Sequence, residues 1–293
     1  MGGIRDAARE AIEAHQASGR QFTAGGVESF VREQGQGAPV VLLHGVPTSS
    51  FLYRKVVPVL AEQGLRAVAF DFPGLGLADR PAEFDYTWSG LARWTGDAVD
   101  ALGIDRCHLV VHDIGGPIGC EWAVANPDRV LSLTALNTIL GLEIFRRPWT
   151  MAPFAVPGLG RAWLASLNPW VFSRLFYLQG IADAAAVPRY QVYAHYELLR
   201  RVDRGRAFLR ISRGYQPTAA KQRLLWEGLE RRSYPTRIVW GQRDPAIPLD
   251  QMRQAQEALG VDDPILLPAK HFLQEDQPNA VAQAIADLAA PLG

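Results

Sequence analysis

Apolar residues along the chain fall into short continuous runs that each end in a polar residue or a glycine. The clearest runs cover residues 39–45, 66–72 and 107–113, and similar runs lie at 130–137, 236–241 and 264–268. Such runs indicate strands of a parallel sheet, because these strands are buried on both faces. Stretches of helical length lie between or after them, at 51–63, 87–102, 114–126, 250–259 and 276–290. Two short strands with a Gly-Gly turn precede them, at 20–32. The alternation predicts an α/β fold with a mostly parallel central sheet flanked by helices.

The alternation stops between residues 139 and 232 and then resumes. This block is rich in aromatic residues at helical spacing, and its Arg and Lys residues clearly outnumber Asp and Glu. An Arg-rich aromatic block could bind RNA, but a helical cap packed over a cleft accounts better for the helical spacing. We therefore expect a core formed by residues 1–138 and 233–293, with a helical cap, or lid, inserted at 139–232.

The composition is that of an ordinary folded protein of 293 residues. Its 30 Lys and Arg residues balance 30 Asp and Glu residues, so net charge favours neither nucleic acid nor an anionic membrane. No apolar run approaches the roughly 20 residues that cross a bilayer, and the N-terminal residues show no secretory or myristoylation signal. Cys107 and Cys120 are too few for a disulfide framework. We expect a soluble cytoplasmic monomer or homodimer with no nucleic-acid or membrane partner.

A strand, a sharp turn and a helix meet at residues 107–126, with Asp113 at the turn. Gly115 and Gly116 follow it, and glycines at these positions let a helix approach a strand closely. The pattern is typical of a nucleophile elbow, in which the turn lifts one side chain above the sheet. Asp113 could alternatively serve only as the N-cap of the helix.

Two more polar residues follow later strands. Asp244 comes after the strand at 236–241, and His271 comes after the strand at 264–268. Each has a simpler interpretation, Asp244 as a turn residue before Pro245 and His271 as a surface residue. However, the ends of parallel strands converge on one crevice, and the order Asp113, Asp244, His271 is the nucleophile, acid and histidine order of an α/β-hydrolase triad.

Five segments carry a resemblance to a known family. They are HGVP at 44–47, GLGLAD at 74–79, VHDIGG at 111–116, WGQRD at 240–244 and KHFLQEDQP at 270–278. Over roughly residues 20–290 the chain resembles the α/β-hydrolase superfamily, in the branch of epoxide hydrolases and haloalkane dehalogenases. The resemblance implies that Asp113 attacks a saturated carbon and that His271, oriented by Asp244, activates the water that hydrolyses the resulting ester.

The resemblance also implies roles for residues around the nucleophile. The backbone N–H groups of Val46 and Ile114 would form the oxyanion hole. His44 and Pro47 lie in the same turn as Val46 and would border the substrate. No cofactor is implied, and no set of His, Cys and acidic residues has metal-ligand spacing.

The leaving group separates the two chemistries of this branch. The dehalogenases usually stabilise the halide with a Trp after the nucleophile and an Asn elsewhere, whereas Ile114 and Val46 here have no donor side chain. An epoxide opens to an alkoxide, which needs an acid, and Tyr215 lies about where the epoxide hydrolases carry a ring-opening tyrosine. Trp163 stands where relatives place a second donor and leaves room for a halide ligand. The other candidate substrate contacts in the cap are Tyr190, Tyr193 and His195.

The sequence therefore predicts a cofactor-independent epoxide hydrolase that converts a small apolar epoxide to a vicinal diol through an ester on Asp113. A haloalkane dehalogenase-like hydrolase is the alternative, and a non-catalytic ligand-binding member of the fold is a further one. An esterase is disfavoured because no Ser occupies the elbow.

Overall fold

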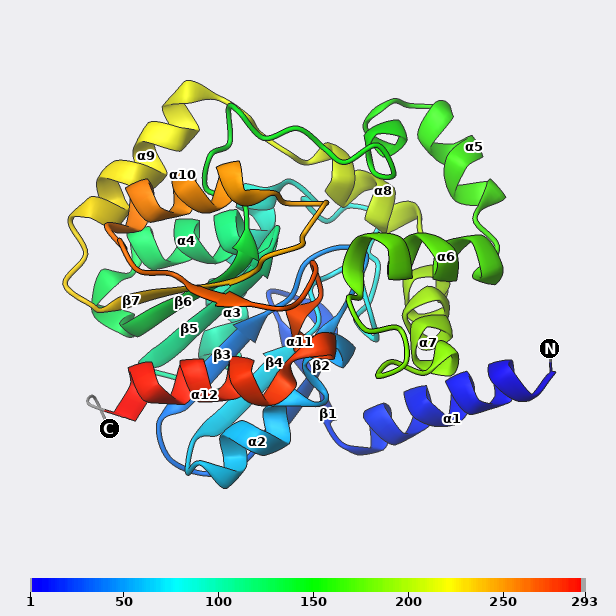
Figure 1. The fold of residues 1–293 in the computed structure, drawn as a ribbon, viewed down its shortest axis with the longest axis horizontal. Coiled ribbons are helices and arrows are strands. Elements are labelled where there is room, and N and C mark those ends of the chain that lie inside the picture. The colour runs from blue at the N-terminus through cyan, green and yellow to red at the C-terminus, as the bar shows by residue number, and fades with distance from the viewer. Residues whose placement is uncertain (1, 291–293) are drawn as a thin grey trace.

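A sheet of eight strands forms the centre of the computed structural model, which describes residues 2–290 (Figure 1). The strands are β1 (Arg20–Ala24), β2 (Val27–Gln34), β3 (Pro39–Leu43), β4 (Arg66–Phe70), β5 (Cys107–Asp113), β6 (Val130–Thr138), β7 (Thr236–Gly241) and β8 (Ile265–Leu267). Their spatial order is β1-β2-β4-β3-β5-β6-β7-β8. β2 pairs antiparallel with β1 and β4, and all other neighbours pair parallel. The mostly parallel sheet expected from the apolar runs is confirmed.

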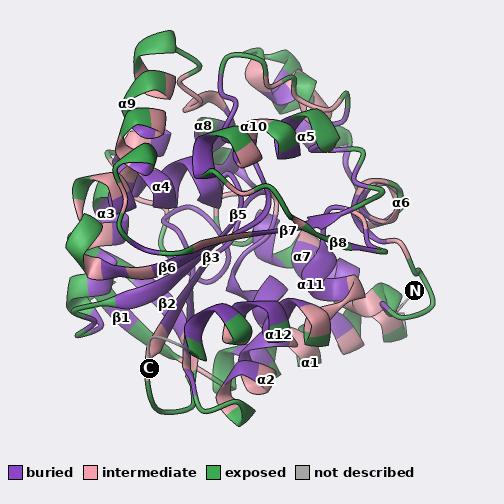
Figure 2. Ribbon diagram, turned by 60° about the vertical axis from the view of Figure 1, so that its left-hand side comes forward, coloured by how far each residue is buried: buried purple, intermediate pink, exposed green. Residues whose placement is uncertain are grey.

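Helices cover both faces of this sheet. One face carries α2 (Val56–Glu62) and α12 (Pro278–Ala289), which pack against each other. The other carries α3 (Trp88–Ala101), α4 (Gly115–Ala125) and α10 (Leu249–Leu259). Alternate residues of β5 enter the two cores: Leu109 packs on the side of α3 and α4, and Val110 on the side of α2 and α12. This double burial explains why the run at 107–113 is continuously apolar, and Figure 2 shows the central strands buried.

The chain between β6 and β7 folds into a short 3₁₀ helix and five α-helices. They are η3 (Ala152–Ala155), α5 (Leu159–Ser166), α6 (Pro169–Gly180), α7 (Arg189–Arg200), α8 (Arg206–Arg213) and α9 (Ala219–Glu230). In Figure 1, α5 to α8 gather to the right of α4 and α10. In contrast, α9 packs against α4 and α10. The last helix of the segment 139–232 therefore contacts the helices of the sheet.

Several element boundaries differ from the sequence prediction. The stretch 51–63 divides into η1 (Ser50–Tyr53) and α2, and the stretch 276–290 forms α12, which the short helix α11 (Leu273–Asp276) precedes. The pattern analysis also missed α1 (Gly2–Ala17), which packs against α7 and buries Ala8 beside Tyr193. Within residues 2–290, no helix is both long and apolar enough to cross a bilayer.

Candidate active site

Asp113 occupies the tight turn between β5 and α4. Its φ of 52° lies in the left-handed region, which non-glycine residues rarely adopt and which often marks a functional constraint. Close packing holds the turn: a Cβ at Gly116 would lie 1.6 Å from Thr138 Oγ1, and that hydroxyl donates to the Asp113 carbonyl oxygen at 2.6 Å. A Cβ at Gly45 would lie 2.2 Å from the Asp113 side chain. Small residues on both sides are therefore required for this position of Asp113.

The Asp113 carboxylate faces a backbone donor on one oxygen and an imidazole on the other. The Val46 N–H donates to Oδ1 at 2.8 Å, and His271 Nε2 lies 3.6 Å from Oδ2. Burial alone would raise the pKa of Asp113, but the hydrogen bond and charge of His271, with a backbone hydrogen bond from Ile114, lower it below its usual value. The carboxylate is therefore ionised at neutral pH, as a nucleophile must be.

His271 connects Asp113 to a second carboxylate. Its Nδ1 lies 2.9 Å from Asp244 Oδ2, while the other oxygen of Asp244 accepts from the N–H groups of Ala246 at 2.7 Å and Ile247 at 3.0 Å. Burial would lower the pKa of His271, but the charges and hydrogen bonds of Asp244 and Asp113 outweigh it and raise the pKa to about 10. The structure thus brings together the three residues that the strand ends predicted.

Asn137, near the end of β6, joins the same network and was not identified from the sequence. Its Nδ2 donates to Asp244 Oδ2 at 2.5 Å, and its Oδ1 accepts from the Gly241 N–H at 2.8 Å. The side chain therefore holds the start of the Asp244 loop and shares the carboxylate oxygen that His271 uses. The sequence feature that could have identified Asn137 is its position near the end of β6, the parallel strand that neighbours β7, because β7 leads to Asp244.

The turn after β3 has its own internal support. His44 is fully buried, its Nδ1–H donates to the Gly45 carbonyl oxygen at 2.9 Å, and its Nε2 accepts from the Phe72 N–H at 3.1 Å. Both ring nitrogens are thus used within the fold, and His44 does not line the cavity described below. The expected substrate contact by His44 is replaced by a structural one, which fixes the turn that presents the Val46 N–H.

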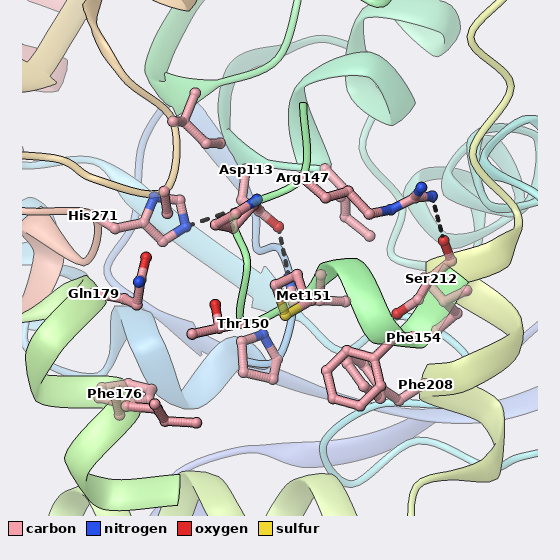
Figure 3. Close-up of a pocket in the computed structure, with 18 of the residues that line it drawn as sticks. Asp113, Arg147, Thr150, Met151, Phe154, Phe176, Gln179, Phe208, Ser212 and His271 are labelled. Carbon is pink, nitrogen blue, oxygen red and sulfur yellow. Dashed lines mark hydrogen bonds and ion pairs between the residues drawn. The ribbon is translucent and has the colours of Figure 1, made fainter. Parts of the chain in front are cut away.

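A cavity of about 120 Å³ lies next to Asp113 (Figure 3). Asp113 and His271 form part of its wall, together with Val46, Pro47 and Ile114 from the core. Most other lining side chains are apolar and come from the segment 139–232, including Met151, Phe154, Leu167, Phe172, Phe176 and Phe208. The cavity therefore presents one carboxylate and one imidazole to a space that is lined mostly by apolar side chains.

Tyr215, expected to supply the ring-opening proton, is not among the lining residues. Its hydroxyl donates to the Leu142 carbonyl oxygen, and its ring packs on Trp88 with 4.6 Å between centroids. Burial raises the pKa of Tyr215 to about 12. The expectation for Tyr215 is corrected, because its hydroxyl is hydrogen-bonded to the backbone and the residue does not line the cavity.

The other aromatic candidates also serve contacts outside the cavity. The indole N–H of Trp163 donates to the Thr150 carbonyl oxygen at 3.0 Å. Tyr190 and Tyr193 pack in the cluster that joins α7 to α1. His195 is buried, with Nε2 3.3 Å from Glu275 Oε1 and its ring stacked on Phe176. None of these side chains lines the cavity, so the structure places them as packing residues and not as substrate contacts.

Four polar side chains of the segment 139–232 line the cavity and were not identified from the sequence. They are Arg147, Thr150, Gln179 and Ser212. Arg147 donates to the Ser212 carbonyl oxygen at 2.8 Å. No motif marks these positions, because the direction of each side chain depends on how the inserted helices pack. In the part of the chain from 2 to 290, no group of three His, Cys, Asp or Glu side chains is placed to hold a metal ion.

Comparisons with known proteins agree with this architecture. The family model described as alpha/beta hydrolase fold matches residues 38–278. Haloalkane dehalogenase 2 of Mycobacterium tuberculosis is 32% identical over 269 residues, which cover 86% of this chain and 88% of that protein. A haloalkane dehalogenase of Psychrobacter cryohalolentis is 30% identical over 258 residues, covering 84% of this chain and 82% of that one.

Solved structures share the fold at lower identity. Cfl2 from Burkholderia cenocepacia superposes with a TM-score of 0.80 at 24% identity and covers 92% of this chain and 94% of its own. The epoxide hydrolase CorEH superposes with a TM-score of 0.80 at 22% identity, covering 94% of this chain and 99% of its own. At these identities the likeness concerns the fold, and the chemistry has to be argued from the residues of the cavity.

Proposed function

The chain belongs to the α/β-hydrolase fold family, in the branch of epoxide hydrolases and haloalkane dehalogenases, and we propose that it hydrolyses its substrate through a covalent ester on Asp113. The observation that carries this proposal is the position of the Asp113 carboxylate. It is ionised, it stands at the wall of an apolar cavity, and it contacts a backbone N–H on one oxygen and His271 on the other. A carboxylate in this setting is a nucleophile toward saturated carbon.

In the first step, Asp113 Oδ2 forms a bond to the substrate carbon, and the leaving group departs with the electron pair of its own bond. Oδ1 then becomes the carbonyl oxygen of the ester. It already accepts from the Val46 N–H at 2.8 Å, and we assign the Ile114 backbone N–H, which helps to lower the pKa of Asp113, as the second donor. These two N–H groups are placed to stabilise the charge that develops on Oδ1 when water attacks the ester.

In the second step, His271 takes a proton from water, and the water oxygen attacks the ester carbon. The free enzyme holds the pKa of His271 at about 10, partly through the negative charge of Asp113. Ester formation removes that charge, so the pKa of His271 falls and the ring releases its proton to solvent before it acts as the base. Asp244 remains hydrogen-bonded to Nδ1 and keeps the ring oriented.

The cavity favours a halide as the leaving group. An epoxide oxygen leaves as a strongly basic alkoxide and needs an acid, but none of the lining residues within 2–290 is a tyrosine. Trp88 also lines the cavity, but its indole N–H donates to the Ile211 carbonyl oxygen at 3.1 Å. A halide departs without a proton, and the Mycobacterium tuberculosis relative at 32% identity is named a haloalkane dehalogenase. We therefore place an alkyl halide before the epoxide that the sequence favoured.

We propose that α5 to α8 form the cap over this cavity and that the substrate is small and apolar. The apolar lining residues contributed by the segment 139–232 support both statements. Because α9 packs against α4 and α10, we place it with the core and not with the cap. The proposed enzyme needs no cofactor, since the nucleophile, base and oxyanion donors are all parts of the chain.

The test is the intact mass of a His271→Gln variant after exposure to n-butyl bromide and, separately, to styrene oxide. Without its base the ester should persist, so n-butyl bromide should add one butyl group in place of a hydrogen, on the peptide that contains Asp113. The double variant with Asp113→Asn is the matched control and should gain nothing. A gain equal to the whole epoxide, with none from the bromide, would establish epoxide opening instead. No gain from a broad panel of both classes would favour the non-catalytic ligand-binding alternative.

A further inference from the structure

The Gln179 side chain lies in the cavity and makes no hydrogen bond within residues 2–290 that would explain its presence there. Its amide lines the cavity, its Oε1 is buried, and neither atom of the amide hydrogen-bonds to any of the described residues. A buried amide oxygen without a donor destabilises the folded protein, because it has lost its hydrogen bonds to water and gained none in return. An unpartnered buried oxygen beside reacting groups needs an explanation. The simplest explanation is that its hydrogen-bond donor is a molecule that is present only during the reaction.

Gln179 is held next to His271 by contacts that do not involve its own side chain. The Phe272 N–H donates to the carbonyl oxygen of Gly180, at the end of α6, at 2.9 Å. Phe176, one turn earlier in α6, stacks on Phe272 with 4.3 Å between ring centroids. The end of α6 and the loop that carries His271 therefore form one packed unit. Figure 3 shows the Gln179 amide oxygen pointing toward the His271 ring.

We propose that Gln179 Oε1 binds the water that hydrolyses the ester on Asp113. The inference rests on the proposed ester mechanism. One hydrogen of the water is directed to His271 Nε2 and the other to Gln179 Oε1, so the lone pair of the oxygen faces the ester carbon of Asp113.

The step balances without any further reactant. The water O–H bond breaks and its proton passes to His271 Nε2 as the water oxygen bonds to the Asp113 ester carbon. The bond between that carbon and the alkyl-bearing oxygen then breaks, and the alcohol leaves with the proton from His271. The water oxygen stays in the Asp113 carboxyl group, which releases the second water proton to His271 and so regenerates the ion pair of the free enzyme, and Gln179 remains an acceptor throughout.

The remaining polar groups of the cavity are less suited to this task. Arg147 has donors only and cannot accept from water. Its guanidinium donates to the Ser212 carbonyl oxygen, on the opposite side of the cavity from His271 in Figure 3. The Thr150 hydroxyl can accept and also lines the cavity, so it is the competing residue that the experiment must separate from Gln179.

The test compares ester formation and ester decay by rapid quenching and intact-protein mass, with n-butyl bromide as the probe. Gln179→Met keeps the length of the side chain and removes the amide oxygen. We expect normal ester formation and decay slowed about 10- to 100-fold, as for loss of one buried hydrogen bond. Gln179→Glu restores an acceptor and should recover decay, measured at a pH high enough to keep His271 neutral in this variant. A purely structural role would not separate the two steps.

The opposing outcomes are distinct. Slower ester formation with unchanged decay in Gln179→Met would reassign the amide to the leaving group, and no change in either step would remove it from the reaction. Slow decay in Thr150→Val but not in Gln179→Met would assign the water to Thr150. If His271→Gln forms the ester and Gln179→Met decays normally, this inference alone fails. If His271→Gln forms no ester, the proposed function fails with it.

Discussion

His271 Nε2 and Asp113 Oδ2 lie 3.6 Å apart in a buried ion pair at the wall of the cavity. The pair couples the two steps of the proposed reaction, because the nucleophile that attacks is also one of the groups that keep the base protonated. When Asp113 becomes an ester, His271 loses an anionic neighbour and retains only Asp244. The change of charge at one residue therefore prepares the other for the next step.

Asp113→Asn should lower the pKa of His271 below its value of about 10 in the free enzyme. The substitution keeps the shape of the side chain and removes its charge, as ester formation does, while the hydrogen bond to Asp244 at 2.9 Å remains. The measurement is a titration of the His271 ring by NMR in both proteins. An unchanged pKa in Asp113→Asn would mean that Asp113 does not control the protonation of His271.

The same pair should affect stability as a function of pH. The folded-state pKa of His271 is raised from 6.5 to about 10. Its contribution to the free energy of unfolding is therefore fully present below pH 6.5 and is lost as the pH rises through about 10. Denaturant unfolding across this range should show a smaller loss in Asp113→Asn than in the unmodified protein.

Tyr215→Phe should leave ester formation and decay unchanged with either probe. The hydroxyl donates to the Leu142 carbonyl oxygen, and Tyr215 does not line the cavity. The expected cost is in the free energy of unfolding, about 0.5–1.5 kcal/mol for one intramolecular hydrogen bond. The rates of ester formation and decay are measured by stopping the reaction at set times, and the free energy of unfolding is measured by denaturant titration of the same preparation. Loss of styrene oxide turnover in this variant would restore Tyr215 as the ring-opening acid.

The contrast between Tyr215 and Asp113 shows how far the sequence could predict this site. The parallel sheet fixes where each strand ends, so Asp113, Asp244 and His271 could be brought together from strand order alone. The residues of the inserted helices have no such register. Whether Tyr215, Trp163 or Gln179 enters the cavity depends on how the helices α5 to α8 pack together. The periodicity of apolar residues does not specify that packing.

Glu275, four residues after His271, should be important for stability. It is buried, with Oε2 2.8 Å from Arg54 Nη2 and 2.9 Å from Lys55 Nζ, and His195 of α7 lies 3.3 Å from Oε1. Burial would raise the pKa of Glu275, but the charge of Arg54 and the hydrogen bonds of His195 and Arg54 hold it well below its usual value.

Glu275→Gln should therefore lower the free energy of unfolding at neutral pH by about 3–5 kcal/mol, because it leaves Arg54 without its buried partner. The stability that the lowered pKa contributes is present above the unfolded-state pKa of 4.5 and is lost as the pH falls through the folded value. The acid side of the stability curve should be flatter in the variant. An equally steep acid side would show that Glu275 does not control acid unfolding. Glu227→Gln, at an exposed pair with Arg231, is the matched control and should change stability little.

Asn137→Ala should slow ester decay more than ester formation. The Asn137 amide donates to the same Asp244 oxygen that His271 uses and accepts from the Gly241 N–H. Its removal leaves that buried N–H without a partner, which costs about 1–3 kcal/mol of stability, and it frees the Asp244 carboxylate to move. His271 is needed as an oriented base only in the second step, so the ester should accumulate. Thr134→Ala, at a buried position earlier in β6, is a control for general loss of stability. If both variants slow the two steps equally, Asn137 stabilises the strand and does not position the triad.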